Sequence, residues 1–205
     1  MCIGMPEFMK VLQTRRSIRR YKSQAIPLDV TLSLLDLCRY AANAHNSQPF
    51  RYIVISNRVV REALIQEMAN IYACDLRADG ASDSTIKTLT KLSTDRFLNA
   101  PVLILACLTM ADMDSYSDPK RQEAEYTMAI QSVANSLQNL LLLAHAKGLG
   151  ANWYCAPLFC PEIVKSILKL PNTFEPQAFI TIGVPDETPP PPKRKPLEEL
   201  IQVID

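Results

Sequence analysis

The chain has 205 residues, 22 Lys and Arg against 21 Asp and Glu, and a mean hydropathy of zero. This near-neutral charge provides no broad attraction to nucleic acid or to an anionic membrane surface, so any anion site must be local. A chain of this length can bury roughly 70% of its unfolded surface, which is enough for one core. We therefore expect a single domain over residues 1–205.

Cysteine and histidine are sparse. The six cysteines form no C-x-x-C pair and only two histidines occur, so the spacing predicts no metal site. Residues 1–10 do not resemble a signal peptide, and no apolar run reaches the roughly 18 residues that a membrane span needs. We expect a cytoplasmic protein with reduced thiols.

Hydrophobic periodicity alternates between helical and strand-like patterns along the chain. It predicts helices at residues 8–15, 27–42, 59–72, 123–147 and 161–168, and strands at 52–55, 101–108 and 178–183. The run 101–108 is apolar throughout, which is typical of a central strand buried on both faces. Strands interleaved with more numerous helices indicate an α+β or mixed α/β fold, and no G-x-G-x-x-G motif marks a dinucleotide-binding fold.

Two segments outside these predicted elements differ from them in composition, one being polar and the other rich in proline. Residues 75–95 are polar and carry Gly80 and Ser82, so they are predicted to be the most mobile segment. Four consecutive prolines at 189–192 hold the C-terminal tail extended. We expect the tail to cross the surface and to end in a short docked helix.

The basic run Arg15–Arg20 has four guanidinium groups and one hydroxyl within six residues. Guanidinium binds phosphate bidentately, so the run is a candidate phosphate site, with a solvated basic turn as an equal alternative. The amide-rich run Asn43–Pro49 suits a heterocycle or polyol, although, taken alone, an ordinary loop is the favoured explanation. Aromatic residues in 153–159 fit a planar ligand or a core, and the basic run 193–195 fits a second anion contact or a solvated tail.

The order of these motifs is more specific than any one of them. The chain contains, in order, Arg15-Arg16-Ser17-Ile18-Arg19, Asn46-Ser47-Gln48-Pro49-Phe50, Gly148-Leu149-Gly150-x-x-Trp153, Gly183-x-Pro185 and a basic tail that begins at Lys193. This series resembles the FMN-dependent nitroreductase family over nearly the whole chain. The resemblance implies a nitroreductase-like α+β fold, with a central mixed, mostly antiparallel sheet flanked by helices. It also implies an intertwined homodimer with FMN at the subunit interface.

The resemblance assigns cofactor binding to Arg15, Arg16, Ser17, Arg19, Asn43, Asn46, Gln48, Pro157, Leu158, Lys193 and Arg194. The resemblance implies that Arg15 and Ser17 face the phosphate and ribityl chain of FMN, and that Arg19 faces the pyrimidine edge of the flavin ring. The segment of Asn46 and Gln48 reaches the flavin of the other subunit. There the chain departs from the family, which commonly has Pro-Ser at the positions of Ala42 and Asn43.

The remaining assignments concern the C-terminal half and the lid. A backbone amide at Pro157 or Leu158 approaches the redox-active nitrogen, and Lys193 with Arg194 binds phosphate. Residues 72–95 form a lid over the substrate, and residues 186–205 form an extended tail.

The activity implied is ping-pong hydride transfer from NADH or NADPH, through FMN, to a nitroaromatic, a quinone or a conjugated alkene. It needs no catalytic side chain and no metal. Two alternatives stay open. The segment 153–160 also resembles flavin-reductase modules of deazaflavin-coenzyme biosynthesis, and the dimer could bind or sequester flavin without turnover. A nucleic-acid binder is disfavoured by the neutral charge.

Overall fold

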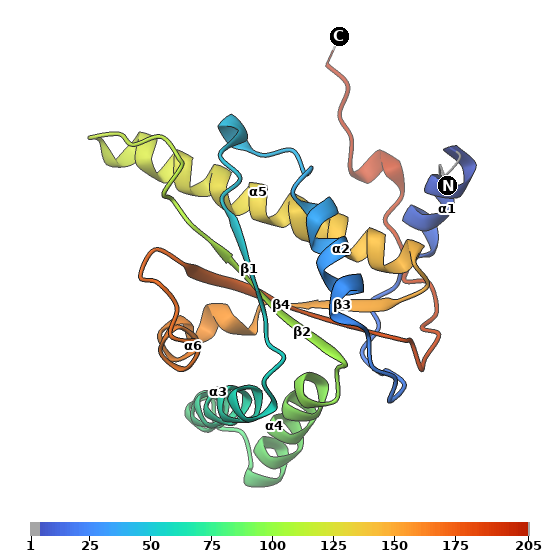
Figure 1. Ribbon diagram of the computed structural model, residues 1–205, viewed down its shortest axis with the longest axis vertical. Coiled ribbons are helices and arrows are strands. Elements are labelled where there is room, and N and C mark those ends of the chain that lie inside the picture. The colour runs from blue at the N-terminus through green and yellow to red at the C-terminus, as the bar shows by residue number, and fades with distance from the viewer. Residues whose placement is uncertain (1–4, 205) are drawn as a thin grey trace.

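The computed structural model describes residues 5–204, so the prediction for Cys2 lies outside the described residues. In chain order the elements are α1 (Met5–Thr14), α2 (Leu28–Cys38), η1 (Ala44–Asn46), β1 (Phe50–Val54), α3 (Arg58–Ala78), α4 (Asp83–Leu98), β2 (Val102–Leu108), α5 (Pro119–Ala146), β3 (Gly150–Tyr154), η2 (Ala156–Phe159), α6 (Pro161–Leu168), β4 (Glu175–Gly183) and η3 (Leu197–Glu199). The sheet lies between two helical layers, with α2 and α5 on one side and α3, α4 and α6 on the other (Figure 1).

The four strands lie in the order β1-β2-β4-β3, and every neighbouring pair is antiparallel. A parallel bridge between Ser17 and Ala151 adds the N-terminal segment to the outer side of β3. These observations confirm the predicted α+β fold with a mostly antiparallel sheet flanked by helices.

Strand β2 lies inside the sheet, and all seven of its residues are buried. Its side chains alternate between two hydrophobic clusters: Ile104 and Ala106 pack with α2 and α5, whereas Leu103 and Leu105 pack with α3 and α6. Because both faces of the strand are covered, both sets of alternating side chains must be apolar. Burial of both faces therefore explains why the run 101–108 is apolar throughout.

Helix α5 begins at Pro119, four residues before its predicted start. Asp118 caps it, because its Oδ1 accepts a hydrogen bond from the backbone N–H of Arg121 at 3.0 Å, and proline is well suited to the first helical turn. At 28 residues α5 is about 42 Å long. No helix among residues 5–204 combines the length and apolar character needed to cross a membrane.

The polar segment 75–95 is largely helical. It comprises the end of α3, a short turn and most of α4, which run side by side as a hairpin (Figure 1). Gly80, with φ of +80°, lies in the turn, and the Ser82 side chain caps α4 by accepting from the N–H of Thr85. The segment is polar because these helices bury only a narrow face, and its role as a lid stays a prediction.

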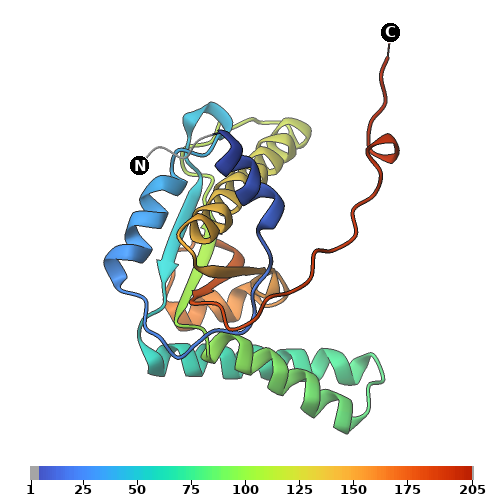
Figure 2. The same cartoon turned by 90° about the vertical axis from the view of Figure 1, so that its right-hand side faces the viewer.

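The C-terminal tail leaves the body of the protein after β4 (Figure 2). Every residue from Pro190 to Ile204 is exposed, including the single 3-10 turn η3. The expectation of a docked terminal helix is therefore wrong for the isolated chain. The proline run keeps the backbone extended, so the tail reaches its terminal turn without packing on the body of the chain.

Candidate functional site

Guanidinium groups gather where α1 ends. Burial lowers the pKa of Arg15, and the charges of Arg194 and Arg16 lower it further, so residues from opposite ends of the chain share one electrostatic site. Within residues 5–204, none of these three arginines forms an ion pair with a carboxylate. A cluster of unneutralised guanidinium groups is a site for an anion such as phosphate.

His145, in the last turn of α5, belongs to the same site. Its Nε2 lies 2.8 Å from the Thr14 hydroxyl. Burial lowers the pKa of His145, and the charges of Arg15 and Arg16 lower it further, so both effects favour the neutral imidazole. Sequence reasoning missed His145 because 131 residues separate it from Thr14.

Arg16 differs from its neighbour Arg15 in what its guanidinium binds. The Arg16 Nη1 donates to the carbonyl oxygens of Gln13 and Arg15, both at 2.8 Å. Those carbonyls lie at the C-terminal end of α1, where a helix dipole favours a cation. Arg16 therefore caps the helix, while the Arg15 guanidinium has no comparable internal partner among the hydrogen bonds of the described chain.

The segment after Arg16 is fixed against the sheet. The Ile18 N–H donates to the Ala151 carbonyl at 3.0 Å, and the Ile18 side chain is buried. A Cβ atom on Gly150 would lie 2.7 Å from Ile18, so glycine is needed there. The Tyr21 hydroxyl donates to the Ile18 carbonyl at 2.5 Å, which closes the segment from its other side.

Glu187, just beyond β4, holds the same segment from the C-terminal side. Its Oε1 accepts from the backbone N–H groups of Arg19 at 2.5 Å and Arg20 at 3.1 Å, and its Oε2 accepts from Arg20 Nε at 3.2 Å. Burial opposes ionisation, but these hydrogen bonds prevail and lower the pKa of Glu187. The carboxylate is thus a positioning group that leaves the Arg19 guanidinium available.

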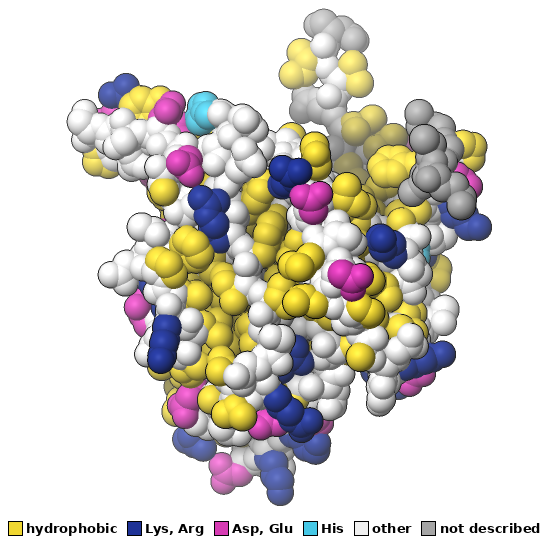
Figure 3. Space-filling view, in the orientation of Figure 1, with side chains coloured by type: hydrophobic (Ala, Val, Ile, Leu, Met, Phe, Trp, Pro, Cys, Tyr) yellow, Lys and Arg dark blue, Asp and Glu magenta, His cyan; other side chains and the backbone are white. Residues whose placement is uncertain are grey.

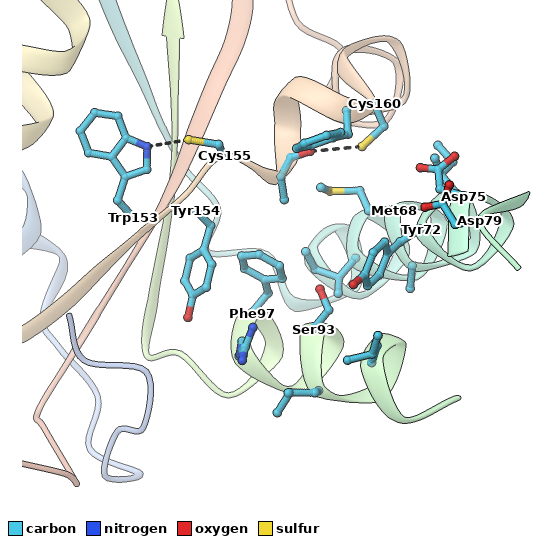
Figure 4. A pocket seen from close by; sticks show the side chains of 18 of the residues that line it. Met68, Tyr72, Asp75, Asp79, Ser93, Phe97, Trp153, Tyr154, Cys155 and Cys160 are labelled. Carbon is cyan, nitrogen blue, oxygen red and sulfur yellow. Dashed lines mark hydrogen bonds between the residues drawn. The ribbon is translucent and has the colours of Figure 1, made fainter. Parts of the chain in front are cut away.

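A cavity of about 840 Å³ opens between the α3–α4 hairpin and the segment from β3 to η2 (Figure 4). Tyr154 and Phe97 meet edge to face in it, with ring centroids 4.9 Å apart. Burial raises the pKa of Tyr154, and the charges of Arg96 and Arg19 oppose that effect, so both guanidinium groups lie near this phenol. Arg96, which sequence reasoning missed, therefore connects the cavity to the Arg15–Arg20 segment.

Pro157 and Leu158 form part of η2, but the residues of η2 that line this cavity are their neighbours Ala156 and Phe159. The Leu158 N–H donates to the Cys155 carbonyl at 3.0 Å, so that amide is already used within the turn. Pro157 has no N–H and is buried. Lys193 and Arg194 lie on the exposed tail, and of these two only Arg194 lowers the pKa of Arg15.

The predicted amide-rich loop lies elsewhere in the chain. Asn43 holds the loop together, because its Oδ1 accepts from the Gln48 N–H at 2.8 Å and its Nδ2 donates to the Ala41 carbonyl at 2.9 Å. The side chains of Asn46 and Gln48 are exposed, and both residues have positive φ. Such backbone strain is common at functional sites.

Helix α5 shows how far this loop lies from the arginine cluster. The Ala44 N–H donates to Ser132 Oγ at 3.1 Å, and His145 follows Ser132 by 13 residues on the same helix. At 1.5 Å per residue the two sites are about 20 Å apart along α5. The structure therefore brings Arg15, Arg16 and Arg194 together and leaves Asn43, Asn46 and Gln48 at a separate place.

Comparison with known proteins agrees with this architecture. The YfhC protein of Bacillus subtilis, provisionally named an NAD(P)H nitroreductase, is 25% identical over 189 residues, which is 92% of this chain and 90% of that protein. The crystal structure of a BluB-like flavoprotein from Clostridium difficile superposes with a TM-score of 0.78 at 22% identity, over 98% of this chain and all of the other.

A further solved structure is that of the NADPH:FMN oxidoreductase from Vibrio harveyi complexed with NAD⁺. It has a TM-score of 0.73 and 16% identity, over 97% of this chain and 77% of that one. The model of the Nitroreductase family matches residues 12–184, which include the arginine segment, the whole sheet and all helices from α2 to α6. On this match the chain belongs to the nitroreductase family.

Proposed function

We propose that this chain is an FMN-dependent oxidoreductase that acts as a homodimer. It would transfer hydride from NADH or NADPH to a nitroaromatic, a quinone or a conjugated alkene. The observation that carries the proposal is the cluster of Arg15, Arg16 and Arg194, which has no carboxylate partner among the described residues. Such a cluster in a nitroreductase-family chain fits the phosphate of FMN.

The other residues of the segment fit the rest of that cofactor. Arg15 and Arg194 would bind the phosphate, and Ser17 would contact the sugar-like chain. Arg19 and Arg96 both act on Tyr154, so they would place positive charge beside the ring, where it favours an anionic form. When bound, FMN supplies a carrier that accepts and returns two electrons with a proton.

The chain's own work is positioning and the exclusion of water. Ile18, Tyr21 and Glu187 fix the backbone of the arginine segment before any ligand arrives. The cavity beside Tyr154 and Phe97 offers an aromatic wall that suits a planar acceptor, and residues 72–95 supply its opposite side. That arrangement supports the expectation that the hairpin acts as a lid and sets specificity.

A second copy of the chain would complete the site. The loop that carries Asn46 and Gln48 lies about 20 Å along α5 from the arginine cluster of its own chain. A dimer in which this loop reaches the partner's cofactor would bring the two predicted groups together, as the family resemblance implies.

Anaerobic stopped-flow mixing tests the proposal. The full chain loaded with FMN is mixed with NADH or NADPH, and then with p-nitrobenzoate or menadione. We expect loss of the flavin absorbance in the first mixing and its return in the second. A holoprotein that is bleached by neither nicotinamide, nor by a reduced deazaflavin, would instead be a flavin-binding dimer without turnover. Bleaching by the deazaflavin alone would identify the biosynthetic alternative.

A further inference from the structure

A histidine and two carboxylates meet at the N-terminal half of α5, in a cluster that the proposed function does not use. His45 comes from η1, Asp114 from the loop between β2 and α5, and Glu125 from α5 itself. His45 Nε2 lies 3.3 Å from Glu125 Oε1 and 3.9 Å from Asp114 Oδ2. We propose that these three side chains bind a divalent transition-metal ion.

Glu125 provides the observation that points to a missing ligand. The residue is only 2% exposed, and its Oε2 is buried without a hydrogen-bond partner within the described chain. A buried carboxylate oxygen without a donor is rare in folded proteins, because desolvation of the charge is not compensated. A cation bound by this carboxylate would compensate it.

The spacing of the donor atoms suits a single ion. Bonds of about 2.1 Å at angles between octahedral and tetrahedral values place ligand atoms about 3.0 to 3.4 Å apart. The His45–Glu125 separation already falls in that range. Asp114 must approach His45 by about half an ångström, and all three donor atoms lie within 4.8 Å of one another; the Asp114 side chain is 59% exposed, so it is free to move.

The charges around the cluster are also appropriate. Within residues 5–204 neither Asp114 nor Glu125 forms an ion pair with lysine or arginine, and the nearby Arg51 engages Asp112 at 3.4 Å. One imidazole and two carboxylates are ligands typical of Zn²⁺ and Mn²⁺, with water in the remaining positions.

The loop that carries His45 is held in place for this role. The His45 backbone has φ of 55°, a left-handed conformation that costs energy for a residue with a side chain. The Ser47 N–H donates to the Ala44 carbonyl, and the Ala44 N–H donates to Ser132 Oγ, so α5 anchors the loop beside Glu125. The strained conformation thus keeps the imidazole facing the two acids.

Manganese titration of the chelator-treated full chain tests this inference. Mn²⁺ is the probe because thiols such as the exposed Cys74 compete poorly for it. The electron paramagnetic resonance signal of free Mn²⁺ reports binding, and we expect one site per protomer. Loss of a ligand should weaken binding by about tenfold or more in H45Q, D114N and E125Q, since even outer-shell changes cost about that much.

Asp112→Asn is the matched control, because Asp112 is an exposed carboxylate two residues from Asp114 that pairs with Arg51 instead. It should bind Mn²⁺ within about twofold of the wild type. D114N keeps the test valid if E125Q misfolds, because Asp114 is exposed. The inference is overturned if the wild-type chain retains no Mn²⁺, or if H45Q and D114N bind it as tightly as the wild type.

Discussion

Arg15 and Arg16 are adjacent in sequence but differ in what surrounds their guanidinium groups. Arg16 is bound by two carbonyl oxygens at the end of α1, whereas Arg15 faces Arg194 without a carboxylate. Removal of a charge-assisted hydrogen bond to phosphate costs about 1.5 to 3 kcal/mol. We therefore expect Arg15→Ala to weaken FMN binding by about 10- to 150-fold in equilibrium dialysis.

Arg16→Ala is the matched control for that measurement. It removes a guanidinium from the same electrostatic site but not from the proposed phosphate contact, so it should weaken FMN binding by less than about fivefold, less than 1 kcal/mol. Equal losses in the two variants would show that general positive potential, and not a specific contact of Arg15, holds the phosphate.

The lowered pKa of Glu187 makes the free energy of unfolding depend on pH. Its pKa is lowered in the folded chain, so the stabilisation is fully present above the ordinary glutamate pKa and is lost as pH falls through the lowered value. Two backbone N–H donors account for most of it, because Arg20 is largely exposed and its ion pair adds little.

We expect Glu187→Gln to lower the free energy of unfolding by about 1 to 3 kcal/mol at pH 7. Urea unfolding from pH 7 downward should show the two proteins converging as pH falls below the ordinary glutamate pKa of about 4.3 and through the lowered pKa of Glu187. A difference that stays constant over this range would mean that packing, and not charge, carries the effect.

At this scale the sequence predicts the residues proposed to bind the ligand better than the residues that hold their backbone in place. Arg15 and Arg194 are found from local composition, and the structure places them together. Glu187 lies 168 residues from Arg19, and a lone acidic residue in a loop has no local signature. Arg96 likewise reaches the site only because α4 packs against α3.

Gly150 and Ile18 connect the arginine segment to β3. A Cβ atom at position 150 would lie 2.7 Å from Ile18 Cβ and Cγ2, so the segment would have to move away from the strand. Overpacking of this kind costs about 1 to 3 kcal/mol. We expect Gly150→Ala to destabilise the chain by that amount in chemical denaturation and to weaken FMN binding as well.

The double variant I18A/G150A separates this contact from other effects of the new methyl group. Ile18→Ala alone leaves a cavity, and adding G150A should then cost about 1 kcal/mol less than it does in the wild type, as coupling between contacting residues predicts. Additive losses would place the strain on the Cβ of residue 18, which I18A keeps, or outside this contact.

Among the elements, the strand and the helix with long apolar runs were predicted correctly, whereas α4 and the conformation of the C-terminal tail were not. The run 101–108 and the long apolar helix gave correct assignments because packing on β2 and α5 constrains every turn of the sequence. Helix α4 was not predicted, because only Ile86 and Phe97 are buried in it and the hydrophobic pattern is therefore weak. Its first turn depends on the Ser82 cap. The docked terminal helix was wrong, because no surface of the same chain covers it.

Large hydrophobic side chains are exposed at many places on the described molecule. Hydrophobic side chains are visible over the face where α2 lies (Figure 3). Exposed apolar residues occur on α1, on α2 and in the tail: Phe8, Met9, Leu12, Leu28, Leu32, Leu37, Leu197, Leu200, Ile201, Val203 and Ile204. Such patches mark interfaces between proteins, which supports the proposed dimer.

The tail gives the sharpest test of that dimer. Its five apolar side chains are between 55% and 86% exposed, and each would contribute about 1.5 to 3 kcal/mol if fully buried against a partner. We expect a chain shortened after Thr188 to sediment as a monomer at micromolar concentration, while the full chain sediments as a dimer. Since every described residue from Pro190 onward is exposed, far-UV circular dichroism should show the same fold in both.

Arg194→Ala separates the two roles of the tail. It removes a proposed phosphate contact without removing apolar surface, so it should weaken FMN binding by about tenfold or more and leave the dimer intact. The shortened chain should lose both properties, because it lacks the cation and the apolar side chains. A shortened chain that remains dimeric would assign the interface to α1 and α2 alone and leave the tail with cofactor binding only.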